Sequence, residues 1–252
     1  MTKAALIVFL LLPGTSRASE APEEHFRRGL DAAGAHDYAN ALSNFEAALA
    51  TDPDNLRYAN EYRQTVIRTK EYDRSLKFFD KLVTDHPNSA NAWLNAGFAL
   101  IDKMPVSGAV TQAILANTAL TRFTNSIKLQ PTIVALYTRG ADYLYWPRVF
   151  NRTPLGIADL EEALKKQKAT EKQNYFFKTW VALGDGYWKL GRTEKAVAIW
   201  KEGLKEFPDN ADLQVRLNKV GDELKAYMDE YYDFNKRVDT DVRFLWEGQK
   251  GH

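Results

Sequence analysis

The chain has 252 residues, which is enough for one large domain or two small ones. Its composition, with 45% hydrophobic and 27% charged residues, is that of an ordinary globular protein. A formal net charge of +1 argues against a nucleic-acid-binding module, for which a basic excess is expected. The sequence contains no cysteine, which excludes disulfides, thiolate metal sites and cysteine nucleophiles.

Residues 1–18 have the order of a secretory signal peptide. Lys3 supplies a positive start, and Ala4 to Leu12 form an apolar run of nine residues. Ser16 and Ala18 then place small residues before a possible cut. A membrane-spanning helix needs about 20 apolar residues, and no later stretch approaches that length. We expect cleavage after Ala18 and a periplasmic or secreted mature chain with no transmembrane segment; an uncleaved anchor or a buried first helix is the alternative.

From residue 22 onward the sequence repeats with a period of 34 residues. Two aromatics, an apolar residue and a proline recur at this spacing: Tyr38, Phe45, Leu49 and Pro53 return as Tyr72, Phe79, Val83 and Pro87. A further copy carries Trp180-x-x-Leu183-Gly184-x-x-Tyr187, followed by Ala196, Trp200, Gly203, Leu204 and Pro208. These residues resemble the tetratricopeptide repeat, a helix–turn–helix unit. The resemblance implies an all-α, right-handed solenoid.

We count five repeat units and a terminal cap within a solenoid of residues 19–233. The units cover about residues 22–55, 56–89, 90–133, 134–176 and 177–210. A capping helix is expected over residues 211–233, with one apolar face formed by Leu213, Leu217, Val220 and Leu224. Such a cap is needed because the last repeat otherwise exposes its core face. Residues 234–252 form a C-terminal tail.

Close packing of two helices explains the spacing within each unit. A glycine in the first helix, such as Gly29 or Gly184, lets the second helix approach, and the aromatic of the second helix is expected to fill the gap to the next unit. In the second unit Arg63 stands at the small position, so we expect that helix pair to splay or the Arg63 head to extend outward. The Pro-Asp/Asn clusters between units are expected to cap the following helix.

Two units contain insertions. The small residue and the bulky residue of a regular unit are 16 residues apart, but Gly97 and Phe123 are separated by 26, and Gly140 and Leu160 by 20. The fourth unit's insertion, Tyr143 to Pro154, is rich in the aromatic and arginine residues that are typical of interface hot spots. We predict that it docks a protein partner through Tyr145, Trp146, Arg148, Phe150 and Arg152. The alternative is that these aromatics pack internally and stabilise the irregular units.

The family resemblance also implies a concave groove, lined by the first helices, that receives an extended peptide or a partner helix. The predicted groove residues are Arg57, Asn60, Gln64, Arg68, Asn91, Phe98, Tyr137, Tyr145, Lys178, Asp185 and Trp188. The alternative is that these residues form only a hydrated inner face. A family subset clamps a C-terminal carboxylate, but Phe26, Leu30 and Glu61 stand where that clamp requires other residues, so we exclude this mode.

The end of the cap and the tail are aromatic, with Tyr231 and Tyr232 in the cap and Phe234, Phe244 and Trp246 in the tail. The tail either folds back on the last helices or serves as a peptide that a partner recognises. Folding back is favoured because an exposed aromatic tail promotes aggregation.

Sequence motifs for catalysis and cofactors are missing. The four histidines are scattered, and neither a nucleophile elbow nor a phosphate-binding loop occurs. An enzyme would require Arg148, Asp159 and Tyr143 to converge in a closed pocket. We therefore predict a non-enzymatic exported scaffold or assembly factor without metal or cofactor, which binds a protein through the groove and the irregular third and fourth units. The alternative is a permanent structural subunit of a cell-envelope complex.

Overall fold

The described chain consists of five helix pairs, followed by a cap and a tail. The computed structural model describes residues 21–233, 236 and 238–247, and the predicted signal segment 1–18 lies outside them. Within these residues there are twelve α-helices and no strand. The helices are α1 Pro22–Gly34, α2 Tyr38–Thr51, α3 Leu56–Thr69, α4 Tyr72–Asp85, α5 Ala90–Lys103, α6 Ala109–Leu129, α7 Ile133–Tyr145, α8 Thr153–Lys168, α9 Phe177–Lys189, α10 Thr193–Glu206, α11 Ala211–Asn218 and α12 Gly221–Tyr231. Three 3₁₀ turns lie between helices, η1 Met104–Val106, η2 Arg148–Phe150 and η3 Asn174–Phe176, and a fourth, η4 Arg243–Leu245, lies in the tail.

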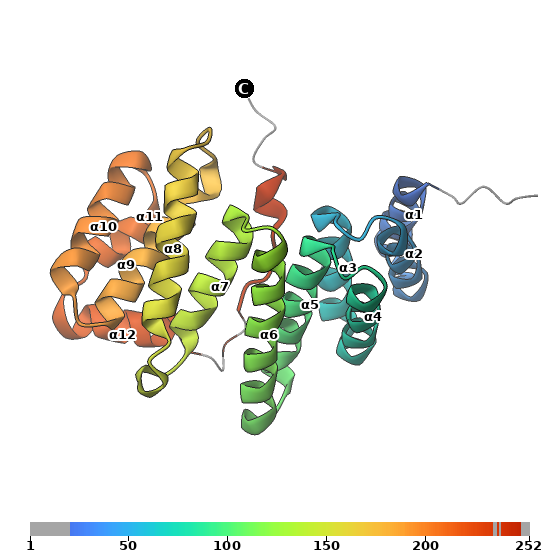
Figure 1. Cartoon of the computed structure of the whole chain (residues 1–252), viewed down its shortest axis with the longest axis horizontal. Coiled ribbons are helices and arrows are strands. Elements are labelled where there is room, and N and C mark those ends of the chain that lie inside the picture. The colour runs from blue at the N-terminus through green and yellow to red at the C-terminus, as the bar shows by residue number, and fades with distance from the viewer. Residues whose placement is uncertain (1–20, 234–235, 237, 248–252) are drawn as a thin grey trace, which may run out of the picture.

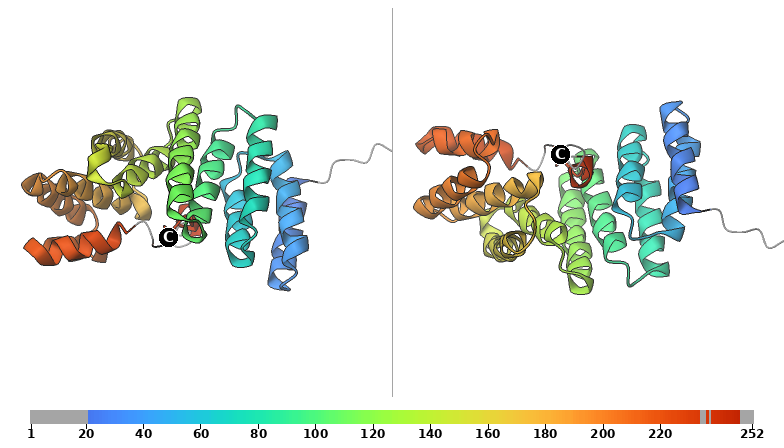
Figure 2. Two further views of the ribbon diagram at one scale, coloured as in Figure 1. Left: turned by 90° about the horizontal axis from the view of Figure 1, so that it is seen from below. Right: turned by 90° about the horizontal axis from the view of Figure 1, so that it is seen from above.

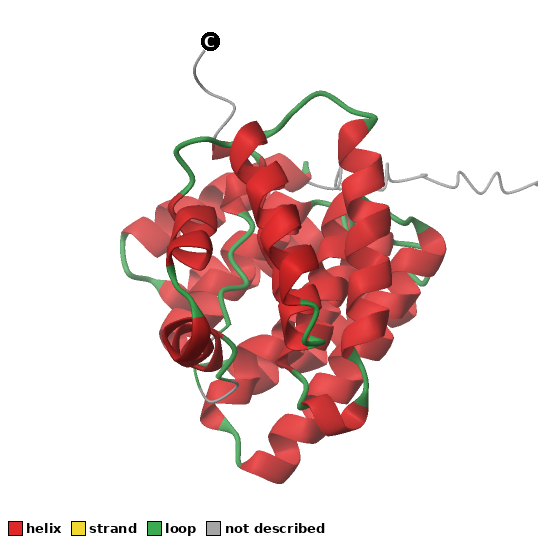
Figure 3. Ribbon diagram, turned by 90° about the vertical axis from the view of Figure 1, so that its left-hand side faces the viewer, coloured by secondary structure: helices red, strands yellow, loops and turns green. Residues whose placement is uncertain are grey.

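The helices pair in chain order, α1 with α2 through α9 with α10, and the five pairs stack into an elongated array (Figure 1). The end-on view in Figure 3 shows helices joined by loops and turns. The predicted all-α solenoid of five helix pairs and a cap is confirmed.

The glycines predicted to allow close approach do so against the aromatic residue of their own unit. A Cβ added to Gly29 would lie 2.4 Å from the Phe45 ring, and one added to Gly184 would lie 2.1 Å from the Trp200 ring. Each ring thus lies directly on the glycine of its own unit. The backbones of α3 and α4, where Arg63 replaces the glycine, approach each other least of the five pairs. The predicted splaying is thus confirmed.

The predicted caps between units are present. The side chain of Asn55 accepts a hydrogen bond from the backbone N–H of Tyr58 at 3.2 Å, and Ser89 and Asn210 cap α5 and α11 in the same way. Each cap satisfies one of the unpaired N–H groups at a helix start. These residues therefore set where each first helix begins.

The insertions lengthen one helix and widen one turn. Helix α6 has 21 residues, whereas the second helices α2, α4 and α10 have 14 each. In the fourth unit the extra residues form η2 between α7 and α8. Both insertions project on the same side of the array (Figure 1).

The cap consists of two helices rather than the single helix expected over residues 211–233. The break falls at Gly221, whose φ of +55° is a left-handed conformation that glycine adopts readily. Val220, expected on the apolar face, is 73% exposed. The cap is held to the fifth unit by Arg216, whose Nε and Nη2 donate to the Asp185 carboxylate at 2.6 and 2.8 Å, with both side chains fully buried.

We expect Gly184→Ala to destabilise the protein by about 1–3 kcal/mol, because its methyl group overlaps the buried Trp200 ring. Gly34→Ala is the matched control, since a Cβ there meets no atom within 4 Å. Urea unfolding followed by circular dichroism measures both. A Gly184→Ala midpoint equal to that of the control would contradict the packing.

Candidate functional site

The C-terminal tail occupies the middle of the concave groove. Residues 238–247 run along the first helices of the second to fifth units, and their position beside the central helices is visible in Figure 2. Thr240 and Val242 are buried, and Val242 packs in one apolar cluster with Leu94 and Phe98. The tail thus folds back, as favoured, but into the groove rather than onto the last helices.

Two side chains of α3 hold the tail backbone. Asn60 Oδ1 accepts a hydrogen bond from Val242 N at 3.0 Å, while its Nδ2 donates to Asp241 Oδ1 at 3.1 Å. Arg63 Nη2 donates to the Thr240 carbonyl at 2.8 Å. Backbone groups buried in the groove are thereby paired, as burial requires.

Arg63 is fully buried at the centre of this contact. Its guanidinium donates to Asp102 Oδ2 and to Asn95 Oδ1, each at 3.1 Å, and lies 4.6 Å from the centre of the Phe98 ring. The Thr240 hydroxyl donates to the other oxygen of Asp102. The expectation that the Arg63 head extends outward is therefore wrong, since the tail and α5 enclose it.

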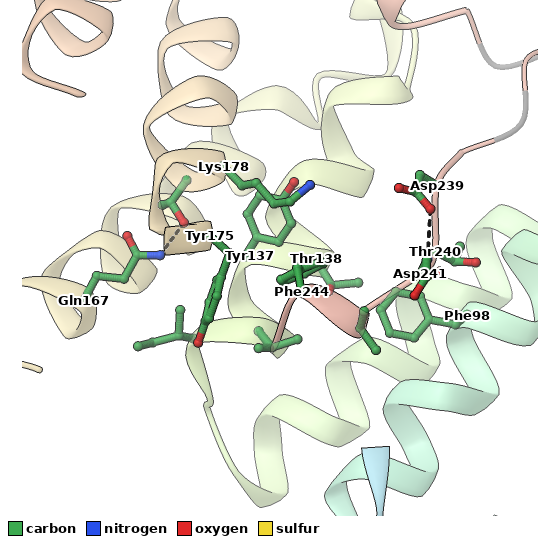
Figure 4. Close-up of a pocket in the computed structure, with 14 residues that line it drawn as sticks. Phe98, Tyr137, Thr138, Gln167, Tyr175, Lys178, Asp239, Thr240, Asp241 and Phe244 are labelled. Carbon is green, nitrogen blue, oxygen red and sulfur yellow. Dashed lines mark hydrogen bonds between the residues drawn. The ribbon is translucent and has the colours of Figure 1, made fainter. Parts of the chain in front are cut away.

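Side chains further along the tail meet the rim of the groove. Arg243 Nε and Nη2 donate to the Glu61 carboxylate at 2.9 and 3.2 Å. The Phe244 ring lies 5.2 Å from the Tyr175 ring, and the Lys178 ammonium lies 4.9 Å from the Phe244 ring. A small cavity of about 60 Å³ remains between the tail and α7 and α9 (Figure 4).

The predicted groove residues divide into two sets. Asn60, Phe98, Tyr137 and Lys178 contact the tail or line the cavity beside it. The others lie elsewhere: Arg57 on the Phe26 ring, Arg68 on the Tyr38 ring, Asn91 bonded to Asp54, Asp185 buried with Arg216, Trp188 beside Arg148, and Gln64 with a buried Nε2 that has no hydrogen-bond partner among the described residues. Tyr145 packs at 5.1 Å on Tyr232.

Sequence reasoning missed Glu61, Arg63, Asp102 and Tyr175 as groove residues. A signal existed for Arg63, because a charged residue at a position of close packing needs a partner. Asp102 was a second signal, as a carboxylate directly after the apolar run Phe98 to Ile101. The pairing of Glu61 with Arg243 joins residues 182 apart, which no local pattern indicates.

The two insertions together form an apolar surface, here called the insertion surface. It consists of Val110 and Ile114 on α6 and Val149 and Phe150 in η2, and Phe150 also lines a hollow of about 210 Å³ between the insertions. Val110 is 78%, Val149 85% and Phe150 56% exposed. The hollow is lined by Ile101, Met104, Ala109, Gln112, Ala113, Ala116, Asp142, Tyr145, Trp146, Pro147, Phe150 and Val238.

Two of the other predicted insertion residues, Trp146 and Arg152, pack against neighbouring side chains. Trp146 lies between the Phe150 ring, 5.5 Å away, and the Arg152 guanidinium, 3.8 Å from its ring centre. Arg152 also donates to Asn117 of α6 at 3.0 Å, which ties the two insertions together. The segment therefore contains both exposed apolar residues and internally packed residues.

Lys189 fixes the start of the fourth unit's insertion. Its ammonium donates to the carbonyls of Leu144 and, at 2.7 Å, Trp146, at the end of α7, where carbonyls lack a partner within the helix. Burial, together with the positive charge of Arg148, lowers the pKa of Lys189 to about 8.

Asp142 is an acid in the wall of the apolar hollow. Its Oδ2 is buried without a hydrogen-bond partner among the described residues. Burial raises the pKa of Asp142 to about 7, against the opposing effects of a hydrogen bond from Trp146 and the charge of Arg152. The carboxyl group therefore changes charge close to neutral pH.

The described residues offer no cluster of three or more histidine, aspartate and glutamate side chains that could hold a metal ion. Asp159, considered for catalysis, forms a bidentate pair with Arg139 at 2.7 Å in both contacts, while Arg148 lies on the Trp188 ring. Across residues 21–233 and the described part of the tail, no helix is long and apolar enough to cross a membrane.

We expect Asp142→Asn to stabilise the protein by about 1–3 kcal/mol at pH 8. In the folded protein the carboxyl keeps its proton up to about pH 7, whereas in the unfolded chain it loses the proton near its usual value of 3.8. Stability of the wild type therefore falls as pH rises from about 4 to 7, and the advantage of the variant should vanish toward pH 4. Thermal unfolding across this range measures it, with exposed Asp209→Asn as control; a gain independent of pH would contradict the assignment.

Comparison with known proteins supports the repeat architecture. Residues 32–99 and 177–220 match models of the tetratricopeptide repeat. Tetratricopeptide repeat protein 8 of Caenorhabditis elegans is 24% identical over 118 residues, which are 46% of this chain and 23% of that protein. The chain thus spans about a quarter of the length of this curated relative.

Solved structures share the fold. A thermophilic TPR protein of Thermus thermophilus has a TM-score of 0.54 and 21% identity, over 78% of this chain and 97% of that one. A tetratricopeptide repeat protein of Parabacteroides merdae also has a TM-score of 0.54, with 15% identity, over 78% of this chain and 70% of that one. The chain therefore carries tetratricopeptide repeats, matched over residues 32–99 and 177–220, and its five helix pairs have the fold of that repeat.

Proposed function

We propose that this protein is an exported scaffold or assembly factor, periplasmic or secreted, that binds a protein partner through its insertion surface. Its fold is that of protein-interaction scaffolds. The export part of the proposal rests on the signal pattern of residues 1–18 and agrees with the lack of cysteine in the sequence.

The single observation that carries the docking proposal is the group of exposed apolar side chains on the two insertions. Val110, Ile114, Val149 and Phe150 are more than half exposed, and Phe150 also lines an apolar hollow between the two insertions. Regular repeats need no such additions to stack. An exposed apolar patch of this kind on a folded protein marks an interaction site.

The partner chemistry follows from the shape of this surface. The ridge of α6 and the turn η2 flank a hollow lined by small alanines, which suits an apolar side chain of the partner. Arg148 stands exposed beside it and supplies a charge at the rim. An amphipathic helix with one apolar face matches both features.

The surface also distinguishes this role from catalysis. Asp142, the acid in the hollow, faces apolar side chains, and Asp159 is already paired with Arg139. We accordingly propose a non-enzymatic role.

The test is capture of partners from an envelope extract by the mature chain, beside Val110→Asp and Phe150→Ser. Both variants place polar groups on the insertion surface without altering the core, so retention of the partner should fall about tenfold or more. Val220→Asp is the matched control, since Val220 is similarly exposed on the cap. The native chain isolated from the periplasmic fraction should have the mass of a polypeptide that begins at Ser19.

Equal retention by all four proteins would exclude the insertion surface as the docking site. A mature chain that aggregates alone, but stays in solution as Phe150→Ser, would instead indicate a permanent subunit of a cell-envelope complex. A native chain that retains residues 1–18 outside the periplasm would contradict the export proposal.

A further inference from the structure

The groove and the tail have the geometry of a receptor with its ligand in place. We propose that the groove is a peptide site that selects five consecutive residues: one with a hydroxyl, then an acidic, an aliphatic, a basic and an aromatic residue. Thr240–Phe244 of the chain's own tail occupies this site in cis. A partner segment of the same chemistry binds by displacing the tail. The groove residues that bind Thr240–Phe244 do not line the hollow of the insertion surface, so each proposal has its own test.

Recognition of the main chain makes the site specific for a peptide. Arg63 binds the carbonyl of Thr240, and Asn60 binds the N–H of Val242 two residues later. These bonds span one residue of the ligand and so fix its register along the groove. Any segment with the same backbone path would satisfy both.

Recognition of side chains supplies the pattern. Asp102 accepts a hydrogen bond from the Thr240 hydroxyl, and Val242 fills an apolar position against Leu94 and Phe98. Glu61 takes the Arg243 guanidinium in a bidentate pair, the geometry that favours arginine over lysine. A ligand that lacks the hydroxyl would leave one oxygen of the buried Asp102 carboxylate without this bond.

Asp241, the acid at the second position, binds the groove and also holds the backbone turn of the ligand. Asp241 Oδ1 accepts from Asn60 and also from the backbone N–H of Arg243, at 2.9 Å, where the turn η4 begins. The side chain therefore caps the turn that presents Arg243 to Glu61 and Phe244 to Tyr175 and Lys178.

Occupancy in cis sets a threshold for any competitor. A tethered segment has an effective concentration on the order of 1 mM, so a free peptide of equal intrinsic affinity competes poorly. The tail also borders the other site, because Val238 lines the hollow of the insertion surface. A partner docked there would lie next to the point where the tail enters the groove.

The test measures binding of a fluorescent peptide with the sequence of residues 238–247 to the full mature chain and to full-length variants, by anisotropy. Arg243→Glu places a like charge against Glu61 and should release the tail, so the peptide should bind at least about tenfold more tightly than to the wild type. Glu61→Arg should instead prefer the peptide in which Arg243 is replaced by glutamate. The chain with both substitutions regains its pair and should again exclude either peptide.

Exposed Lys165→Glu, a charge reversal of the same size away from the groove, is the control and should behave as the wild type. Circular dichroism confirms that each variant is folded. As a second route, a protease site inserted between Asp233 and Val238 is cut, and exchange of the severed tail for labelled peptide is followed.

Peptide binding to the wild type as tight as to Arg243→Glu would overturn occupancy in cis. Failure of every folded variant and of the cut chain to bind the peptide would overturn the site itself. A wild-type chain that dimerises through its tail, and loses the dimer with Arg243→Glu, would make a second copy the occupant and would also overturn the assignment in cis.

Discussion

A buried guanidinium is the constraint on which the centre of this structure depends. Arg63 stands where other units carry glycine, and burying its charge is unfavourable unless acceptors surround it. Asp102 and Asn95 of the next unit supply two of these acceptors, and the carbonyl of Thr240 supplies another. The splayed second unit and the tail within the groove therefore meet at the same buried guanidinium.

The third and fourth units contribute residues both to the groove and to the insertion surface. In the groove, Phe98 of α5 and Tyr137 of α7 line the cavity beside the tail. Away from it, the lengthened α6 and the turn η2 expose Val110 and Phe150. Because the tail occupies the middle of the groove, the insertions carry an apolar surface that remains exposed.

Local regularities in the sequence were enough to predict the solenoid. The period of 34 residues, the Gly184 motif, the caps such as Asn55 and the location of both insertions all follow from spacing within one unit. The tail in the groove was beyond this reasoning, because its contacts join residues as far apart as Glu61 and Arg243. Asn60 was predicted for the groove from its place on α3, whereas Asp185 shared that pattern and is buried with Arg216. A polar stripe by itself does not separate ligand contacts from internal ion pairs.

The most direct measurement of the central claim is hydrogen exchange of residues 238–246 in the full mature chain, read by mass spectrometry. We predict slow exchange at Val242, whose N–H is buried and bonded to Asn60, with protection approaching that of the neighbouring helix α5. Loss of that protection in Arg243→Glu, with α5 still protected, would agree with a displaceable segment. Exchange of Val242 in the native chain at the rate of an unstructured peptide would contradict burial of the tail in the groove.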